Sequence, residues 1–318
     1  MSTPAPSPVA IDIADAFLAE PEGLAGTKAL LVMRHGEVIL ERYADGVMSD
    51  TTLVSWSMAK SFTQAVLGLA VADGLLDPEQ PAPVAAWQDD ERRHITIRHL
   101  LTMRSGLRFR EDYVDGSNSD VIEMLFGGGK LDVAAYAIAQ PLEHEPGTFW
   151  QYSSGTTNIL CRIIGDAVGG GPDGLRAYVE ARLLRPLDMG RATMRFDGAG
   201  TFIGSSFLYA TAREFATFGE LYRLGGTWNG TRLLPEGWTE QARTPTPTPA
   251  TEEYGYANHW WLWPSAGAFA ALGYQGQHCV VVPDRGLVVV RLATTPDEHK
   301  RWSRALLHRL IEAFPISD

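Results

Sequence analysis

The chain has 318 residues, of which 45% are hydrophobic and 20% are charged, and this composition is typical of a globular protein with a sizeable core. The formal net charge of −11 and the lack of a dense Lys/Arg run disfavour nucleic acid or an anionic membrane as a partner. No apolar run is long enough to span a membrane, and residues 1–9 lack the basic and apolar segments of a signal peptide, so we expect a cytoplasmic protein.

The predicted elements of the first half begin with a short helix over residues 11–19 and a β-hairpin over residues 28–43, whose turn falls at His35-Gly36. An apolar helix follows Ser57 and is closed by Gly74 and Pro78. Residues 81–90 are expected to form a loop rich in proline and alanine. Residues 95–164 are expected to be mostly helical, and the glycine-rich residues 169–174 to form a turn.

In the second half, the capping box Thr211-Ala212-Arg213-Glu214 predicts a helix that ends at Leu224. Residues 243–249 alternate threonine and proline and predict an extended loop. The apolar runs 277–282 and 286–292 flank Pro283-Asp284-Arg285-Gly286 and predict a hairpin, and a last helix follows over residues 297–314. Strands at both ends with helices between them predict an α/β layer built from both termini and a helical insertion.

The strongest indication of chemistry is Ser57-Met58-Ala59-Lys60, the only Ser-x-x-Lys in the chain. Residues 58–76 carry two formal charges, on Lys60 and Asp73, and a helix that is apolar on all sides is normally buried. Burial lowers the pKa of a lysine, which makes Lys60 a candidate base. Three residues of helix nearly complete a turn, so the Ser57 hydroxyl and the Lys60 amine should lie side by side. The alternative is a chance tetrapeptide whose lysine reaches solvent.

A serine nucleophile that relies on a lysine needs a further proton-transferring group, and a tyrosine from another segment is one solution. Two tyrosines begin a Tyr-x-Ser/Asn triplet, Tyr152-Ser153-Ser154 and Tyr256-Ala257-Asn258. The first follows the turn Glu145-Pro146-Gly147-Thr148, which would present it at an element boundary. The second lies in an aromatic run that is more typical of a strand packed on the core. Tyr152 is therefore the preferred candidate, and Tyr256 is the alternative.

Together these motifs resemble the serine β-lactamase and penicillin-binding protein superfamily, in its class C-like branch. The resemblance runs from about residue 28 to residue 314 and includes residues 95–107, 146–154, 185–190 and 209–213. The Lys-Thr-Gly motif of that branch is absent, and residues 269–277 occupy its place. Gly273-x-x-Gly276-Gln277 and Arg110-Glu111-Asp112-Tyr113 look like the 6-aminohexanoate-dimer hydrolases and related carboxylesterases. Because the missing lysine helps β-lactamases to hold the drug carboxylate, its absence argues against efficient turnover of penicillins.

The resemblance implies a β-lactamase-like fold of the α/β (α+β) type. An antiparallel sheet with flanking helices would comprise residues 1–56 and 200–318, a mainly helical domain would comprise residues 57–199, and the active site would lie between them. It also implies that Lys60 and Tyr152 take the proton of Ser57, which attacks a carbonyl to form an acyl-enzyme. Backbone N–H groups of Ser57 and of a residue between 272 and 274 would hold the oxyanion. The resemblance further implies supporting or substrate-binding roles for Tyr113, Ser154, Tyr274, Gln275 and Gly276.

We therefore expect a serine hydrolase that acts on a small-molecule ester or linear amide without a cofactor or metal. The alternatives are a β-lactamase or D-amino-acid peptidase, and a catalytically silent binding protein on the same fold. The sequence names neither the natural substrate nor the oligomeric state.

The remaining conspicuous residues have simpler interpretations. The two cysteines, Cys161 and Cys279, lie in apolar surroundings and are expected to be inert core thiols. The histidines show no metal-binding spacing; His99 is expected to be structural, and His278, next to the strand expected beside the pocket, is a secondary candidate for a site role. Trp56, next to the nucleophile, is expected to line the pocket.

Overall fold

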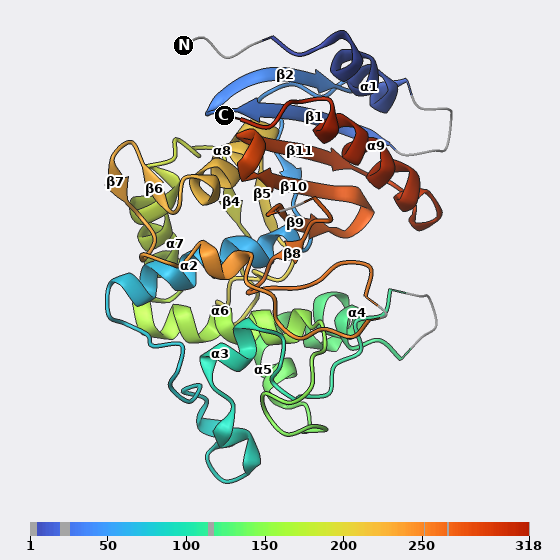
Figure 1. Ribbon diagram of the computed structural model, residues 1–318. Coiled ribbons are helices and arrows are strands. Elements are labelled where there is room, and N and C mark those ends of the chain that lie inside the picture. The colour runs from blue at the N-terminus through green and yellow to red at the C-terminus, as the bar shows by residue number, and fades with distance from the viewer. Residues whose placement is uncertain (1–4, 20–25, 114–117, 251, 266, 318) are drawn as a thin grey trace.

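An antiparallel sheet built from both ends of the chain forms one layer of the computed structural model, which describes residues 5–19, 26–113, 118–250, 252–265 and 267–317 (Figure 1). Within these residues the sheet has six strands, and every neighbouring pair is antiparallel. In spatial order they are β2 (Glu37–Tyr43), β1 (Thr27–Arg34), β11 (Leu287–Ala293), β10 (Gln277–Val282), β9 (Phe269–Gly273) and β8 (Trp261–Leu262). The two predicted hairpins are confirmed, and β1 joins them by pairing with β11.

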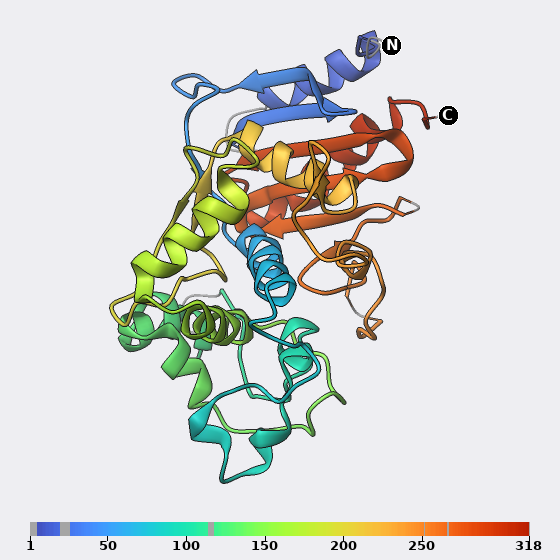
Figure 2. The same cartoon turned by 90° about the vertical axis from the view of Figure 1, so that its left-hand side faces the viewer.

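Helices cover both faces of this sheet, because successive side chains of each strand point to opposite faces. Leu30 and Val32 of β1 pack in one hydrophobic cluster with α1 (Pro8–Leu18) and α9 (Lys300–Glu312). Leu31 and Met33 pack in the other cluster, which includes α8 (Ala212–Arg223) and α2 (Met58–Ala72). Figure 2 shows the sheet between these helices. The predicted capping box of Thr211 and Glu214 is present at the start of α8.

The middle of the chain is mainly helical and lies next to α2, on the side of the sheet that ends in β9 and β8 (Figure 1). The helices of this region are α3 (Ile97–Leu101), α4 (Asp120–Phe126), α5 (Val133–Ile138), α6 (Ser154–Val168) and α7 (Gly171–Val179). The central helix, α6, packs against α2, α3 and α5. Two small sheets accompany them, formed by β3 (Leu53–Val54), β5 (Leu208–Ala210) and β4 (Thr193–Met194), and by β6 (Thr227–Trp228) and β7 (Thr231–Arg232). The division into domains at residues 56 and 199 stays a prediction.

The expected turn at residues 169–174 is wrong in its second half, because α7 already begins at Gly171. Gly170 adopts a left-handed conformation, with a φ of 73°, and turns the chain into the helix. Pro172 lies in the first turn of α7, where its fixed φ suits the helix and its missing N–H is not needed. The proline therefore starts a helix instead of marking a loop.

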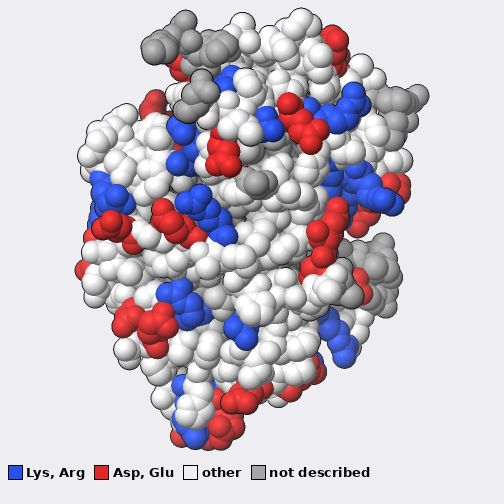
Figure 3. Space-filling model, in the orientation of Figure 1, with Lys and Arg blue, Asp and Glu red and all other residues white. Residues whose placement is uncertain are grey.

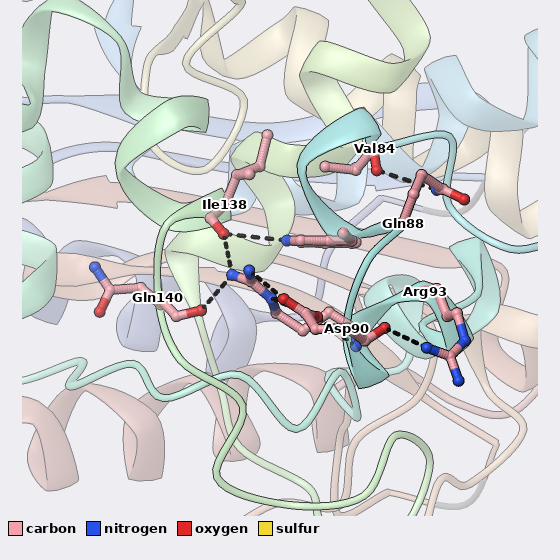
Figure 4. A network of polar contacts seen from close by, with 8 residues as sticks. Val84, Gln88, Asp90, Arg93, Ile138 and Gln140 are labelled. Atoms are coloured by element: carbon pink, nitrogen blue, oxygen red, sulfur yellow. Dashed lines mark hydrogen bonds and ion pairs between the residues drawn. The ribbon is translucent and has the colours of Figure 1, made fainter.

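The segment between α2 and α3 is fastened to the end of α5 by a group of polar contacts (Figure 4). The Arg92 guanidinium donates hydrogen bonds to the carbonyl oxygens of Ile138 at 3.0 Å and Gln140 at 3.1 Å, and it pairs with Asp90 at 2.7 Å. The indole N–H of Trp87 also donates to the Ile138 oxygen, at 3.1 Å. The predicted loop over residues 81–90 thus contains one 3₁₀ turn, Ala85–Trp87, and a second, Glu91–His94, follows it. Both turns belong to a segment that is anchored on the helical region.

Charges of both signs are interspersed over the face shown in Figure 3, so no large basic patch occupies it. None of the described helices combines the length and apolar character needed to cross a bilayer. Likewise, no group of three or more His, Cys, Asp or Glu side chains within the described residues could hold a metal ion. The cytoplasmic location stays a prediction.

Candidate active site

Ser57 is the half-buried N-cap residue of α2. Trp56 has a φ of 45°, and this left-handed residue turns the chain between β3 and the helix. The Ser57 hydroxyl makes no capping hydrogen bond to the described backbone of α2 and is therefore free for other contacts. Every residue from Met58 to Ala70 is buried, which confirms that the helix is enclosed on all sides.

The Lys60 amine lies beside the Ser57 hydroxyl, as the helical spacing predicts. Its Nζ is 3.1 Å from Ser57 Oγ, 2.9 Å from Ser154 Oγ and 3.0 Å from the carbonyl oxygen of Ser205. The side chain is 1% exposed, and burial lowers the pKa of Lys60 to about 8, although the Glu111 carboxylate acts in the opposite direction. About one tenth of the amine is consequently neutral at pH 7.

Tyr152 reaches the same place from the segment that precedes α6. Its ring centroid is 4.8 Å from Lys60 Nζ, and its side chain lines the cavity above Ser57. Burial raises the pKa of Tyr152, while hydrogen bonding to the Ser57 side chain partly offsets this rise. Tyr256 packs edge-on against Tyr152 at 5.9 Å and is not among the described residues that line the cavity. The geometry therefore brings Tyr152, and not Tyr256, to the nucleophile.

The cavity above Ser57 has a volume of about 280 Å³, and both aromatic and charged side chains line it. Tyr113 and Tyr274 both line it, and their rings stack with centroids 5.1 Å apart and an interplanar angle of 12°. Trp56 packs edge-on against Tyr274 at 5.6 Å, but it is not among the described lining residues. The expectation that Trp56 lines the pocket is therefore wrong: the indole supports the wall from behind.

The edge of β9 closes one side of the cavity and approaches the nucleophile segment closely. A Cβ atom at Gly273 would lie 2.3 Å from the carbonyl oxygen of Ser55, so only glycine allows this approach. A 3₁₀ turn, Tyr274–Gly276, follows the strand. Gly276 lines the cavity, whereas Gln275 is not among the described lining residues, and its carbonyl oxygen accepts a hydrogen bond from the N–H of Thr295 at 2.9 Å. The predicted substrate contact of Gln275 thus lacks support from the cavity.

Two buried side chains hold the turn after β9 from behind. Arg291 Nη1 donates to the Gly276 carbonyl oxygen at 3.1 Å, and His278 Nδ1 is 2.8 Å from the same oxygen. Because a carbonyl oxygen only accepts, His278 Nδ1 carries the hydrogen. Burial lowers the pKa of His278 to about 3, so the ring is neutral at physiological pH. His278 also lines the cavity, but its evident role is to position the turn.

His99 and the two cysteines have the structural roles that the sequence predicts. His99 forms the capping box of α3 with Thr96, whose N–H donates to His99 Nδ1 at 3.3 Å. Cys161 and Cys279 are free and buried, and burial raises the pKa of each thiol to about 12. Thiolate chemistry is therefore disfavoured at both cysteines.

Glu111 is a member of the site that was not predicted from the sequence. One carboxylate oxygen accepts hydrogen bonds from the hydroxyls of Ser154 at 2.5 Å and Tyr113 at 2.9 Å, and the other accepts from the Ser154 N–H at 2.8 Å. It was noticed only as part of a motif with Tyr113. A single carboxylate in a loop has no spacing pattern that would have pointed to Ser154.

The charged rim of the cavity was missed as well. Lys300 pairs with Asp297 at 2.7 Å, and its Nζ lies 5.6 Å from the centroid of the Tyr274 ring. Arg304 pairs with Glu253. Lys300 and Arg304 lie one turn apart on α9, more than 240 residues after Ser57, so no local pattern links them to the nucleophile.

Comparisons with known proteins identify a family and relatives that match most of the chain. A sequence profile of the family described as Beta-lactamase matches residues 18–313. The chain is 30% identical over 297 residues to a 6-aminohexanoate-dimer hydrolase of Paenarthrobacter ureafaciens. The match covers 86% of this chain and 74% of that protein.

Two solved structures share the fold at low sequence identity. The first is described as "Putative 6-aminohexanoate-dimer hydrolase from Bacillus anthracis"; it has a TM-score of 0.79 and 23% identity over 90% of this chain and 78% of that one. The second is a family VIII carboxylesterase, with a TM-score of 0.67 and 15% identity over 98% of both chains.

Proposed function

The chain belongs to the beta-lactamase family, and from this premise we propose that it is a serine hydrolase that cleaves carboxylic esters and unstrained linear amides through an acyl-enzyme on Ser57. One observation carries the proposal: a buried lysine amine with a lowered pKa lies 3.1 Å from the hydroxyl of a serine that lines a cavity. This is the arrangement that an activated nucleophile requires.

The contacts of Lys60 explain how it acts as a base. A neutral amine has two N–H groups and one lone pair. The Ser154 hydroxyl and the Ser205 carbonyl oxygen, at 2.9 and 3.0 Å, take the two N–H groups. The lone pair is then directed at the third neighbour, Ser57 Oγ, from which it accepts the proton as the hydroxyl attacks a substrate carbonyl.

Tyr152 completes the proton transfer. Its phenol is hydrogen-bonded to Ser57 and lies beside Lys60, so it passes a proton to the departing alcohol or amine. Because burial raises the pKa of Tyr152, the phenol stays protonated at neutral pH and is suited to the role of general acid. Water then attacks the acyl-enzyme by the reverse sequence of proton transfers.

The oxyanion of the tetrahedral intermediate would be held by backbone N–H groups. The N–H of Ser57 lies at the positive end of α2, and the edge of β9 at residues 272–274 faces it across the cavity. Gly273 permits a close approach between this edge and the segment that carries Ser57. A substrate carbonyl oxygen near Ser57 would therefore lie within reach of both.

Esters and linear amides fit the cavity better than β-lactams do. The chain has no Lys-Thr-Gly, and the two cations that line the cavity in the described part of the chain, Lys300 and Arg304, are each engaged by an acidic residue. A β-lactam carboxylate would therefore find no unpaired lysine or arginine among the described lining residues. The 30% identical relative, named for a linear amide dimer, supports linear amides among the substrates.

The test combines an active-site label with substrate comparison. The wild type is expected to be labelled by a fluorophosphonate and to hydrolyse p-nitrophenyl acetate with burst kinetics. Ser57→Ala should lose both, while Ser317→Ala, a serine on the far C-terminal segment, should keep both. Labelling that persists in Ser57→Ala, or a wild type that shows neither property, would refute the proposal. A cephalosporin and a 6-aminohexanoate dimer, assayed in parallel, rank the substrate classes.

A further inference from the structure

The Ser154 hydroxyl lies between a hydrogen-bond donor and a hydrogen-bond acceptor. On one side Lys60 Nζ, at 2.9 Å, donates a hydrogen bond to Ser154 Oγ. On the other side the same Oγ donates to Glu111 Oε1 at 2.5 Å. Ser154 is fully buried, and the three groups form a short chain from the amine to the carboxylate. This chain connects a loop residue, Glu111, to the base of the proposed reaction.

The chemistry of a carboxylate decides in which direction the hydroxyl points. An ionised carboxylate only accepts hydrogen bonds, so the single O–H of Ser154 must point toward Glu111. The lone pairs of Ser154 Oγ then face Lys60 and accept one of its N–H groups. Without this acceptor the hydroxyl could turn round and donate to the lysine instead. It would then occupy the lone pair that the proposed mechanism needs for Ser57.

We propose that Glu111 is a positioning residue of the hydrolase, which holds the Ser154 hydroxyl as an acceptor for Lys60 and so keeps the lysine lone pair directed at Ser57. The inference rests on the proposed function. Glu111 itself acts through Ser154, since the described contacts of its carboxylate are with Ser154 and Tyr113. The contact with Tyr113 links the same carboxylate to the wall of the cavity.

Electrostatics gives the proposal a second, measurable consequence. Among the described residues, the titratable groups that influence Lys60 are Glu111, Tyr152, Cys161 and His259. Burial keeps Tyr152 protonated, raises the pKa of Cys161 to about 12 and lowers that of His259 to about 3, so these three are neutral around pH 7. Glu111 is thus the anion that favours the protonated form of Lys60. Removal of its charge should lower the pKa of Lys60.

A purely structural alternative exists, because the second oxygen of Glu111 accepts the Ser154 N–H at 2.8 Å and so caps the start of α6. The experiment separates the two roles. The kcat and KM of the wild type, Glu111→Gln, Glu111→Asp and Ser154→Ala are measured on p-nitrophenyl acetate between pH 5.5 and 9.5. Glu143→Gln, which removes an exposed carboxylate in another loop, is the control for net charge.

Glu111→Gln is expected to lower kcat at least fivefold, with KM changed less than threefold, and to move the acid limb of the kcat/KM profile to lower pH. The amide can donate to Ser154, which reverses the hydroxyl, and it carries no charge. Glu111→Asp should restore part of kcat and the position of the acid limb, and Glu143→Gln should match the wild type. A folded Glu111→Gln with less than a fivefold loss of kcat, or with an unmoved acid limb, would overturn the proposal.

Ser154→Ala decides the matter if Glu111→Gln does not fold, since it breaks the chain of contacts but leaves the backbone N–H on Glu111. A kcat loss of fivefold or more supports the proposal, and a smaller loss overturns it. The wild type separates this inference from the proposed function. If it does not hydrolyse the ester, the proposed function fails; if it does and the variants behave like it, only the role of Glu111 fails.

Discussion

Acidification is expected to stop the reaction as Lys60 becomes protonated. With a pKa of about 8, the neutral fraction of Lys60 is about one half at pH 8 and about 1% at pH 6. Because only the neutral amine accepts the Ser57 proton, kcat/KM should fall about 50-fold over this interval. Above pH 9 the rate should reach a plateau, since almost all of the amine is then neutral and Tyr152 remains protonated.

The plateau is what distinguishes a buried lysine from an exposed one. A lysine with its ordinary pKa of about 10.4 would let kcat/KM rise about tenfold per pH unit through pH 9. The assay is the initial rate of p-nitrophenyl acetate hydrolysis at substrate concentrations well below KM, from pH 5.5 to 10. It is followed at the isosbestic wavelength of the product and corrected for spontaneous hydrolysis with Ser57→Ala. A profile that is flat from pH 6 to 8, or that still climbs tenfold between pH 9 and 10, would refute the reasoning.

Three further changes test neighbouring parts of the account. Tyr152→Phe should lower kcat on the order of 100-fold by removing the general acid, and a wild-type kcat would contradict that role. Gly273→Ala should lower both kcat and Tm, because its Cβ would lie 2.3 Å from the Ser55 oxygen; Gly190→Ala, where the new Cβ meets no atom within 4 Å, is the control and should change neither. Because the pKa of Lys60 is lower in the folded state than in the unfolded state, the unfolded state binds more protons between pH 8 and 10.5, and stability should rise with pH there. The gain from pH 8 to 10 is about 2 kcal/mol; denaturant unfolding should show it in the wild type but not in Lys60→Met, and equal slopes would contradict it.

Much of the reacting pair could be predicted because it depends on local geometry. The period of one helix places Ser57 and Lys60 together whatever the rest of the chain does, and the apolar residues around them predict burial and hence a lowered pKa. The hairpins at both ends could also be predicted, since apolar, strand-forming segments flank short turns. Tyr152 was preferred over Tyr256 because it follows the turn at residues 145–148, and the resemblance of several motifs to one family then gave it a role beside Ser57.

Other features depend on contacts between distant segments and left no local signal. Glu111 joins the site through hydrogen bonds to Ser154 and Tyr113, and Lys300 reaches the rim because α9 packs on one face of the sheet. Trp56 was expected to line the cavity because it is next to Ser57, but the left-handed turn at this residue directs its ring against Tyr274 instead. Gly171 starts a helix that looked like a loop, since glycine and proline both end some helices and begin others.

Covalent acylation of Ser57 is the central step of the proposed reaction, and mass spectrometry of the quenched enzyme measures it directly. The wild type is mixed with excess p-nitrophenyl acetate at pH 8, stopped in acid within the burst phase and digested. We expect one added acetyl group, located on the peptide that contains Ser57, and no adduct on the same peptide of Ser57→Ala. Turnover of the ester without any acyl adduct, or an adduct on another residue that persists in Ser57→Ala, would contradict the account.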